Sequence, residues 1–502
     1  MIQRARYILL AALALLLATL ACNAPDPMAE PTIAFYTQVP TAFPTSTPVI
    51  TPLPTRPAYN PGELVDYIVQ TGDTLPALAA RFNTSEAEIL AANDNIPREV
   101  TTLPPGMPMQ IPIYYLPFWG SPYRILPDSH FVNGPLATDF DTQAFVNQHS
   151  GWLKDYSDYV GGKTRTGAQI VDYVATNFSV SPRVLLALLE YQAGALSSNI
   201  RTGQQVKYPL GYESRNHQGV YLQLVWAANK LNNGYYGWRE GSLLEWQLAD
   251  GRLERPDPWQ NAASVALQNY FNIIMPGNLY PIASSAEGFA QTYVNLFGDP
   301  WKIDEPHIPV SLEQPELLLP WDRGKTWAYT GGPHTGWGTG EPFAALDFAP
   351  QTTVGGCGVS EQWATAMASG VVVRSEIGIV ILDLDGDGDE RTGWNILYLH
   401  LATKDRPTVG TYIEAGGNVG HPSCEGGTST GTHIHIARKY NGEWIMADGP
   451  LAFNMEGWVP QSGTAAYKGT LTRFEKLVTA SSNANQASLI TSQGSTDRPI
   501  GP

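Results

Sequence analysis

A chain of 502 residues is too long for a single hydrophobic core, so about three domains with linkers are expected. The composition is that of a globular protein, with 43% hydrophobic residues and many Gly (48) and Pro (40), which excludes global disorder. The formal net charge of −16, from 46 acidic and 30 basic residues, excludes a nucleic-acid partner. A neutral sugar or peptide polymer, recognised through hydrogen bonds and stacking, remains a suitable partner.

Residues 1–22 are predicted to be a secretory signal. Arg4 and Arg6 precede an apolar run over 7–21, which is shorter than the roughly 20 residues that span a membrane. The last signal residues, LAC, resemble a bacterial lipobox, although Thr19 stands where Leu is usual. This resemblance implies that Cys22 is lipidated and anchors the protein to a membrane. Ordinary secretion and an uncleaved anchor are the alternatives, and all three place the protein outside the cytoplasm.

Residues 23–63 are rich in Pro and Thr and predict an extended linker that cannot form a packed core. The following segment, 64–114, is compact and regularly patterned. Its predicted elements are a strand, two helices and a second strand, over 66–70, 75–81, 85–93 and 109–113.

The segments YIVQTGDTL (67–75) and LPPGMPMQIPI (103–113), with Ala79, Phe82, Ile89 and Asn93, make this region resemble the LysM module. The resemblance implies a βααβ fold that binds N-acetylglucosamine-containing glycans between the first strand–helix loop and the loop after the second helix. The implied glycan contacts are Gly72, Asp73, Thr74, Leu75, Asn95, Ile96 and Pro97. A helix-capping turn is the competing interpretation of the Asp73-Thr74 pair.

Residues 115–313 predict an aromatic-rich α-helical domain. The segment SPRVLLALLEYQAG weakly resembles the start of lysozyme-like transglycosylase domains, in which a helix ends in Glu-Ser-Gly and the Glu is the general acid. Aligned on the glycine, the place of the acid holds Gln192, which cannot donate the proton. Glu190 lies roughly 200° around the helix from it. A structural or glycan-binding role is therefore favoured over an active glycosidase.

Residues 314–470 predict an antiparallel β domain, because Gly-rich turns alternate with short β runs such as GIVILDLD and THIHIARKY. The polar segment 471–502 is predicted to be disordered. The expected fold class is thus multidomain, with a small βααβ module, a helical middle domain and an antiparallel β domain. Cys357 and Cys424 are expected to form a disulfide, since an exported protein meets an oxidising environment. Free or zinc-bound thiols are the alternative.

Five of the nine histidines fall in the β domain. His433 and His435 are two residues apart in a strand-like segment, so both side chains point to the same face. His400 ends the run WNILYLH, and His334 lies thirteen residues before Asp347. A catalytic zinc takes three N or O ligands and keeps one open position, which this set can supply. Taken singly, each could instead be a hydrogen-bonding residue of a β core.

The motifs STGTHIH (429–435) and YLH (398–400), with the pair His334 and Asp347, make the domain resemble the lysostaphin-type peptidoglycan metallopeptidases. The commonest form has its first His four residues before the Asp, where this chain has Phe343, and the longer spacing resembles the LasA-like branch. The resemblance implies that zinc is bound by His334, Asp347 and His435. It implies catalytic roles for His400 and His433, with the general base left open between them.

The segment DLDGDGDER (383–391) gives Asp383, Asp385 and Asp387 the early spacing of a calcium loop, so they are candidate calcium ligands. The twelfth position is Trp394, where an EF-hand requires a bidentate Glu, and an EF-hand is therefore excluded. The alternative is an acidic hairpin turn between two strands.

Together these features predict a membrane-anchored envelope protein that binds peptidoglycan and hydrolyses its peptide bonds through a zinc-activated water. A glycan-binding module beside the catalyst would raise the local concentration of substrate. The rival hypothesis is a non-catalytic peptidoglycan-binding protein, or an activator, that uses a metallopeptidase fold. The complete set of ligand and catalytic residues argues against this rival.

Overall fold

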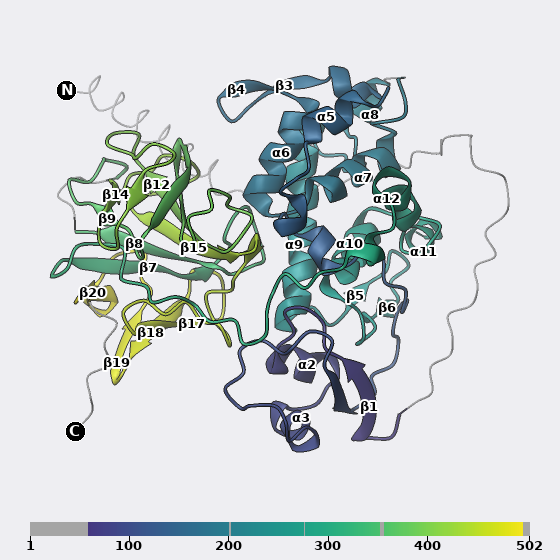
Figure 1. Cartoon of the computed structure of the whole chain (residues 1–502), viewed down its shortest axis with the longest axis horizontal. Helices are drawn as coiled ribbons and strands as arrows, with labels where there is room; N and C mark the ends of the chain where they lie inside the picture. The colour runs from purple at the N-terminus through teal and green to yellow at the C-terminus, as the bar shows by residue number, and fades with distance from the viewer. Residues whose placement is uncertain (1–58, 200–201, 276, 352–355, 495–502) are drawn as a thin grey trace, which may run out of the picture.

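The computed structural model describes residues 59–199, 202–275, 277–351 and 356–494 (Figure 1). The predicted signal, Cys22 and most of the predicted linker lie outside these residues. Within the described ranges no helix is both long enough and apolar enough to cross a membrane. The chain forms a small N-terminal region, a helical region and a β region, in that order.

The small region is a βααβ unit, as the sequence predicts. Strands β1 (Glu63–Ile68) and β2 (Pro108–Ile113) pair antiparallel, and helices α2 (Leu75–Arg81) and α3 (Glu86–Ala92) lie between them in the chain. Each helix starts at a side-chain cap, which satisfies amide groups that would otherwise lack a partner. Thr74 caps α2, and Ser85 forms a capping box with Glu88 at α3.

The helical region packs around its longest helix, α9 (Gly219–Glu240), whose neighbours are α6 (Gly167–Phe178) and α10 (Ala262–Ile274). Large aromatic side chains of α9, such as Tyr235 and Trp238, are fully buried. The other elements are α4 (Asp128–Phe131), η1 (Pro135–Ala137), α5 (Thr142–Asn147), η2 (Trp152–Asp155), β3 (Ser157–Val160), β4 (Lys163–Thr166), α7 (Pro182–Ala193), α8 (Gly203–Lys207), β5 (Trp246–Gln247), β6 (Leu253–Glu254), α11 (Leu279–Ala283), α12 (Phe289–Phe297) and η3 (Pro300–Ile303).

The β region is built on a nine-stranded antiparallel sheet, in which β13-β10-β11-β12-β15-β8-β7-β20 are neighbours in that order and β16 pairs with β15. These strands are β7 (Thr326–His334), β8 (Ala345–Pro350), β10 (Gly370–Glu376), β11 (Gly378–Asp383), β12 (Trp394–Leu401), β13 (Tyr412–Ile413), β15 (Ile434–Tyr440), β16 (Glu443–Trp444) and β20 (Leu489–Thr491). Smaller sheets hold β9 (Ala364–Thr365), β14 (Asn418–Gly420), β17 (Val459–Ser462), β18 (Gly469–Arg473) and β19 (Lys476–Thr479), and η4 (Gln486–Ser488) precedes β20.

The two faces of the large sheet pack against different partners, because side chains alternate between faces along a strand. One face contributes Leu382, Tyr398 and Ile436 to the core of the β region itself. The opposite face contributes a second set to the core of the helical region, namely Ile379, Ile381, Leu397, Leu399 and Ala437. The β and helical regions therefore share one hydrophobic core across their boundary.

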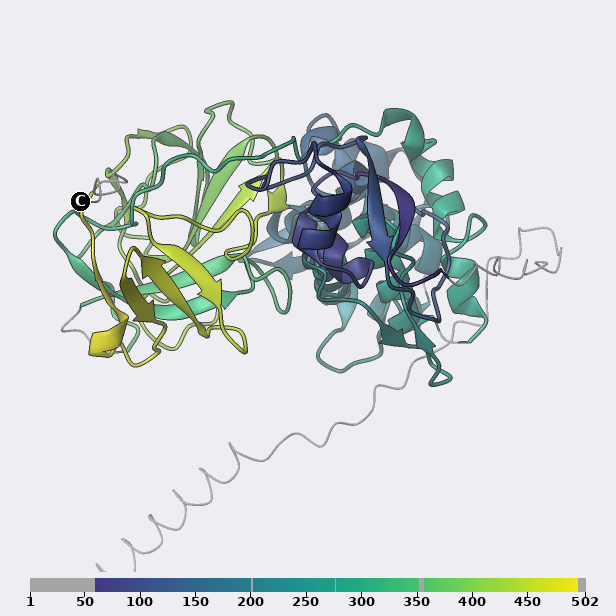
Figure 2. The same ribbon diagram turned by 90° about the horizontal axis from the view of Figure 1, so that it is seen from below.

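The small region is docked against the helical region (Figure 2). Arg81 of α2 donates to the carbonyl of Trp238 at 2.9 Å, and Gln70 donates to the carbonyls of Trp259 and Gln260. The connector between the helical and β regions also contacts it, since Thr102 donates to the Pro309 carbonyl at 2.8 Å. The small region is thus held in place by contacts with two other parts of the chain.

A buried cluster of charges joins all three regions, and we call it the Arg239 junction: Arg239, Asp128, Glu443, His307 and Tyr235. The Arg239 guanidinium lies 3.3 Å from the carboxylates of both Asp128 and Glu443. Glu443 also contacts His307 Nε2 at 2.6 Å and accepts from the Tyr235 hydroxyl at 2.8 Å. Arg239 further donates to the carbonyl of Thr71 in the small region. Burial works to raise the pKa of Glu443, but Arg239 and His307 lower it to about 2.

The predicted disorder of 471–502 is wrong for residues 471–494. Strands β18 and β19 form a hairpin against β17, and β20 pairs with β7 at the edge of the large sheet. Leu471, Val478 and Ile490 are buried, and they are spaced too widely among polar residues to form a sequence pattern. The buried carboxylate of Glu456 accepts hydrogen bonds from Ser492, Gln493 and Gly494. The β domain therefore extends well beyond the predicted boundary at residue 470.

Truncation after Thr470 should destabilise the protein strongly, because it removes β19, β20 and three buried apolar side chains. Each such side chain contributes about 1.5–3 kcal/mol, so the free energy of unfolding should fall by about 5 kcal/mol or more. Scanning calorimetry of the full chain and of the truncated chain measures the difference. Truncation after Gly494 is the matched control and should leave the melting temperature unchanged. Equal melting temperatures for both truncations would contradict the assignment.

Replacing Arg239 by Met should lower the free energy of unfolding by about 3–5 kcal/mol, since it leaves buried carboxylates without their counter-charge. The double variant Arg239→Met/Glu443→Gln should be less destabilised than Arg239→Met alone, because one of these charges is then also absent. Arg252→Met is the control, as Arg252 pairs with Asp250 at the exposed surface and such pairs contribute little. Thermal unfolding of these proteins and of Glu443→Gln alone tests the junction, and additive effects of the two substitutions would refute it.

Candidate metal centre

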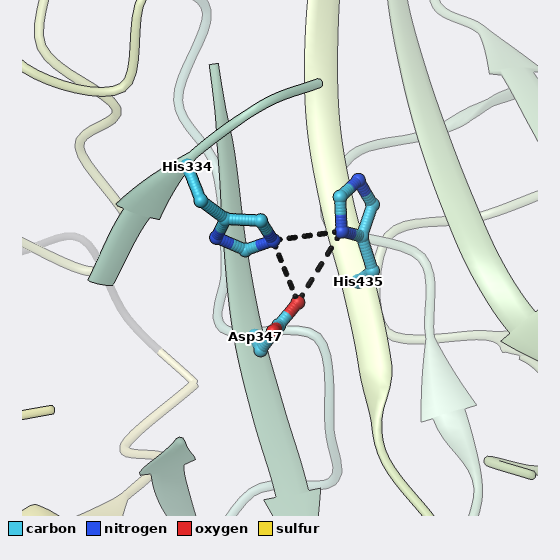
Figure 3. A group of neighbouring side chains, drawn as sticks. All are labelled: His334, Asp347 and His435. Atoms are coloured by element: carbon cyan, nitrogen blue, oxygen red, sulfur yellow. Dashed lines mark hydrogen bonds and ion pairs between the residues drawn. The ribbon is translucent and has the colours of Figure 1, made fainter. Parts of the chain in front are cut away.

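Three neighbouring strands bring His334, Asp347 and His435 together, although they are far apart in the sequence (Figure 3). His334 ends β7, Asp347 lies in β8, and His435 lies in β15 directly opposite Asp347 in the antiparallel register. Residues paired across two strands project to the same face. The sequence predicts a strand around His435, but only the pairing of β15 with β8 places Asp347 beside it.

The three ligand atoms lie at nearly equal distances. His334 Nε2 is 3.0 Å from His435 Nδ1 and 3.2 Å from Asp347 Oδ1, and His435 Nδ1 is 3.3 Å from the same oxygen. All three residues are buried. Ligands about 2.0–2.1 Å from a zinc ion at the corners of a tetrahedron lie about 3.3 Å from one another. The spacing therefore fits three ligands of one tetrahedral zinc.

Hydrogen bonds on the far side of each ring determine which nitrogen faces the centre. His334 Nδ1 donates to the Gly332 carbonyl at 2.7 Å, and His435 Nε2 donates to the Gly336 carbonyl at 3.1 Å. Because a carbonyl oxygen only accepts, the neutral rings face each other and Asp347 with lone pairs. Three lone pairs at this distance repel one another unless a cation lies between them. Metal-binding histidines typically donate their other ring N–H to a carbonyl or carboxylate in this way, which fixes the orientation of the ring.

Two further histidines border this centre. His433 Nε2 lies 3.8 Å from Asp347 Oδ1, and its Nδ1 donates to the Gly431 carbonyl. His400 Nδ1 donates to the Glu425 carbonyl at 2.9 Å, and the ring centres of His400 and His433 are 4.6 Å apart. Both rings therefore also have an Nε2 lone pair. The structure brings together all five residues that the sequence singled out, with the three predicted ligands nearest one another.

Burial and the neighbouring rings shape the titration of these groups. Burial, with His433 and His435 nearby, lowers the pKa of His400 to about 4. Burial also lowers the pKa of His435. For Asp347, burial acts to raise the pKa, but the positive charge that His334 and His435 carry when protonated holds it well below its usual range. An ionised carboxylate with neutral imidazoles is the protonation state that binds a metal.

The centre opens into a groove of about 660 Å³. Its walls include Trp337 and Thr339 on one side and the Gly/Ser/Thr-rich segment 426–432 on another. The predicted disulfide between Cys357 and Cys424 is present, with Cα atoms 5.4 Å apart. It lies beside this wall, since Thr432 donates to the carbonyls of Gly356 and Gly358. The disulfide thus stiffens one side of the groove.

Tyr467 is a site residue that the sequence did not indicate. Its ring stacks on His334 with 4.0 Å between ring centres, and it lines the groove. It lies in the turn between β17 and β18, and a single Tyr in a polar turn carries no motif. Tyr467 is brought to the site by backbone hydrogen bonds with Gly332 and Pro333. This pairing between distant segments is visible only in the fold, so the sequence gives no signal for it.

The implied glycan contacts need correction. Asp73 is only 1% exposed, and its carboxylate is occupied by Tyr67, Gln70 and Arg81. Leu75 and Ile96 belong to the core of the small region. These three side chains cannot contact a glycan, because their partners in the fold occupy them. A Cβ atom at Gly72 would come within 2.5 Å of the Arg239 guanidinium, so only glycine fits at this position, and the glycine itself is partly exposed. Thr74, Asn95 and Pro97 remain at least partly exposed.

Glu190 and Gln192, in the weakly lysozyme-like segment, have structural partners. The Glu190 carboxylate accepts from the amides of Leu196 and Ser197, which follow the end of α7. Gln192 donates to the Leu210 carbonyl and accepts from the Tyr270 hydroxyl at 2.6 Å. A separate acidic group lies at the end of β11 and in the following loop, and it consists of Asp383, Asp385 and Asp387. It is distinct from the group of His334, Asp347 and His435.

One sheet presents to one groove a His-Asp-His group that could hold a metal ion and two further imidazoles, which is an arrangement suited to a metal-dependent hydrolase. A family model described as the LysM domain matches residues 67–112, and one described as the LasA N-terminal domain matches residues 124–311. The chain is 26% identical over 388 residues to the protease LasA of Pseudomonas aeruginosa, with 73% of this chain and 83% of that protein covered.

The chain is also 26% identical over 160 residues to the beta-lytic metalloendopeptidase of Lysobacter enzymogenes, which covers 32% of this chain and 86% of that protein. Among solved structures, the deep-sea M23 metalloprotease pseudoalterin is 23% identical, covering 33% of this chain and 96% of its own, with a TM-score of 0.29. The sequence matches confirm the predicted resemblance. The chain is a metalloendopeptidase that is similar in sequence to LasA and to the beta-lytic enzyme, and it carries a LysM domain. These relatives also agree with an extracytoplasmic, cell-envelope protein.

Substitutions should separate metal ligands from catalytic residues. His334→Ala and His435→Ala should each lose zinc, whereas His433→Ala should keep zinc and lose about 10²–10⁴-fold in turnover. Metal analysis of the purified proteins by mass spectrometry gives the zinc content. His421→Ala is the control, because His421 is buried elsewhere and bonded to the Gln362 carbonyl. Stoichiometric zinc in His334→Ala would show that this ligand is misassigned.

Proposed function

We propose that the chain is a zinc endopeptidase of the cell envelope that hydrolyses peptide bonds of peptidoglycan, with zinc held by His334, Asp347 and His435. The observation that carries this proposal is the group of two imidazole lone pairs and one carboxylate oxygen, all within 3.3 Å of one another. When bound, zinc supplies a Lewis acid that polarises a carbonyl group and lowers the pKa of water. The chain must supply the remaining steps.

His433 and His400 are the catalytic residues of this proposal. Each carries its proton on Nδ1, bonded to a backbone carbonyl, so its Nε2 is free to accept a proton from the attacking water. The same ring can return that proton to the leaving amine. Either ring can take this role, because their centres lie 4.6 Å apart in the same groove. Both rings lie in the groove wall with the metal ligands, so one substrate carbonyl can reach all of them.

The groove favours an extended peptide chain as substrate. The wall at 426–432 offers hydroxyl groups and backbone amides, which pair with the polar groups of a peptide. Tyr467 keeps the His334 ring in place by stacking on it. The relatives are named as a protease and a beta-lytic metalloendopeptidase, and the LysM domain is suited to the glycan of the same wall polymer. Glycan contacts are proposed for Gly72, Thr74, Asn95 and Pro97, which are at least partly exposed.

The proposed location is the outer side of the cytoplasmic membrane. Lipidation at Cys22, after a signal over 1–22, would anchor the chain, and the Pro- and Thr-rich linker over 23–63 would hold the folded regions away from the membrane. The support for this anchor is the sequence alone. The helical region, 115–313, is proposed to act as a scaffold that holds both the LysM domain and the β region, since both dock on α9 and its neighbours.

The full chain with zinc should release free amino groups from purified peptidoglycan without releasing reducing sugar ends. A zinc chelator should abolish this release. His433→Ala should still sediment with peptidoglycan while releasing few amino groups, and Glu190→Gln should behave as wild type because Glu190 only caps a chain turn. New reducing ends without new amino groups would refute the peptidase assignment in favour of glycan cleavage.

A further inference from the structure

The loop between β11 and β12 concentrates negative charge without a counter-charge. Asp383, Asp385 and Asp387 each offer a carboxylate oxygen, and these atoms all lie within 4.8 Å of one another. Asp383 is buried at the end of β11, and the other two are exposed in the loop. Backbone amides of Asp385 and Gly388 donate to the two oxygens of Asp383, so the loop folds around this carboxylate.

The basic side chains near this loop are already paired with other acids. Arg391 pairs with Asp389 at 2.5 Å, and Arg374 pairs with Glu390 at 2.9 Å. Among the ion pairs of the described residues, none involves Asp383, Asp385 or Asp387. Three carboxylates at such short distances repel one another, and a bound cation removes that repulsion.

A second feature, independent of the acids, points to a ligand at the same place. Asn395 lies directly opposite Asp383 in the pairing of β11 with β12, so the two side chains share a face. It is 1% exposed, and its Nδ2 donates to the Thr392 carbonyl inside the loop, which turns the carboxamide toward the loop. Its Oδ1 has no hydrogen-bond partner among the residues that the structure describes. An unpaired buried oxygen costs about 1–3 kcal/mol, so it needs a partner.

We propose that Asp383, Asp385, Asp387 and Asn395 form a calcium site. All four side chains would bind a metal through oxygen atoms, which suit a hard cation such as calcium. Zinc binds better to sites with imidazole nitrogens, such as the one formed by His334 and His435. Asn395, supplied by the neighbouring strand, replaces the glutamate that a helical calcium loop places at its twelfth position. The partly exposed loop fits calcium, which accepts irregular sets of six to eight oxygens, better than magnesium, which requires a regular octahedron.

The site also has a structural consequence, because the far side of the loop contacts the helical region. Arg391 donates to the Ala137 carbonyl at 2.8 Å, and Arg374, which holds Glu390, donates to Asn177. Lys439 pairs with Glu390 and donates to the Thr176 carbonyl at 3.1 Å. Calcium that orders the loop over 384–393 therefore stabilises the contact between the β and helical regions.

The test is calorimetric titration of calcium chloride into the full, zinc-loaded chain. We expect one calcium ion per chain and a higher melting temperature. Asp385→Asn, Asp387→Asn and Asn395→Ala should each weaken calcium binding at least tenfold and lose the thermal shift. Asp322→Asn, which changes an exposed aspartate outside the cluster, is the matched control and should bind as wild type. Zinc content measured in every variant separates this site from the zinc centre.

Hydrogen exchange provides a second measurement. Calcium should slow the exchange of amides in residues 384–393 of the wild-type chain, and should not do so in Asp387→Asn. The proposal is overturned if the wild-type chain shows no saturable calcium binding, because the loop is then only an acidic hairpin turn. It is equally overturned if Asp385→Asn and Asp387→Asn, or Asn395→Ala, bind calcium with wild-type affinity, because the ion would then lie elsewhere.

Discussion

The arrangement of the whole chain depends on one buried guanidinium. Arg239 leaves the last turn of α9 and contacts Asp128 of the helical region, Glu443 of the β region and the Thr71 carbonyl of the LysM domain. A buried charge of this kind is stabilising only while every partner is present. The three regions are therefore interdependent, because displacing any one of them leaves charged groups buried without a partner.

The geometry of the metal centre also depends on contacts between regions. The side chains of Asn229 and Asn233 in α9 accept hydrogen bonds from the backbone amides of Thr339 and Glu341, in the loop that follows β7. This loop includes Gly336, whose carbonyl accepts from the His435 ring. The orientation of His435, a proposed metal ligand, is thus set partly by a helix of another region. The face of the sheet that carries His435 and Asp347 also packs its Ala437 and Ala345 into the core of the helical region.

The sequence predicted the βααβ module, the antiparallel β domain, the disulfide and the five residues around the metal centre, because short motifs and alternating strands are local signals. It could not predict what depends on contacts between distant segments. Asp73 shows this, since it looks like an exposed loop residue until Arg81 and the docking of the module are known. Residues 471–494 show it as well, because their order comes from pairing with β7 and from the Glu456 carboxylate rather than from their own composition.

The docking of the LysM domain changes how its two tasks can be combined. A module on a flexible tether searches a volume around the catalyst, and its effect depends on linker length. Here Arg81, Gln70 and Thr102 hold the module rigidly to the helical region and to the connector before the β region. The distance between the glycan site and the peptide-cleaving site is then fixed by the fold, so the protein selects wall segments by the spacing of their sugar and cross-link. Wall strands whose cross-links lie at that one spacing from an accessible sugar can occupy both sites at once, and others can occupy only one.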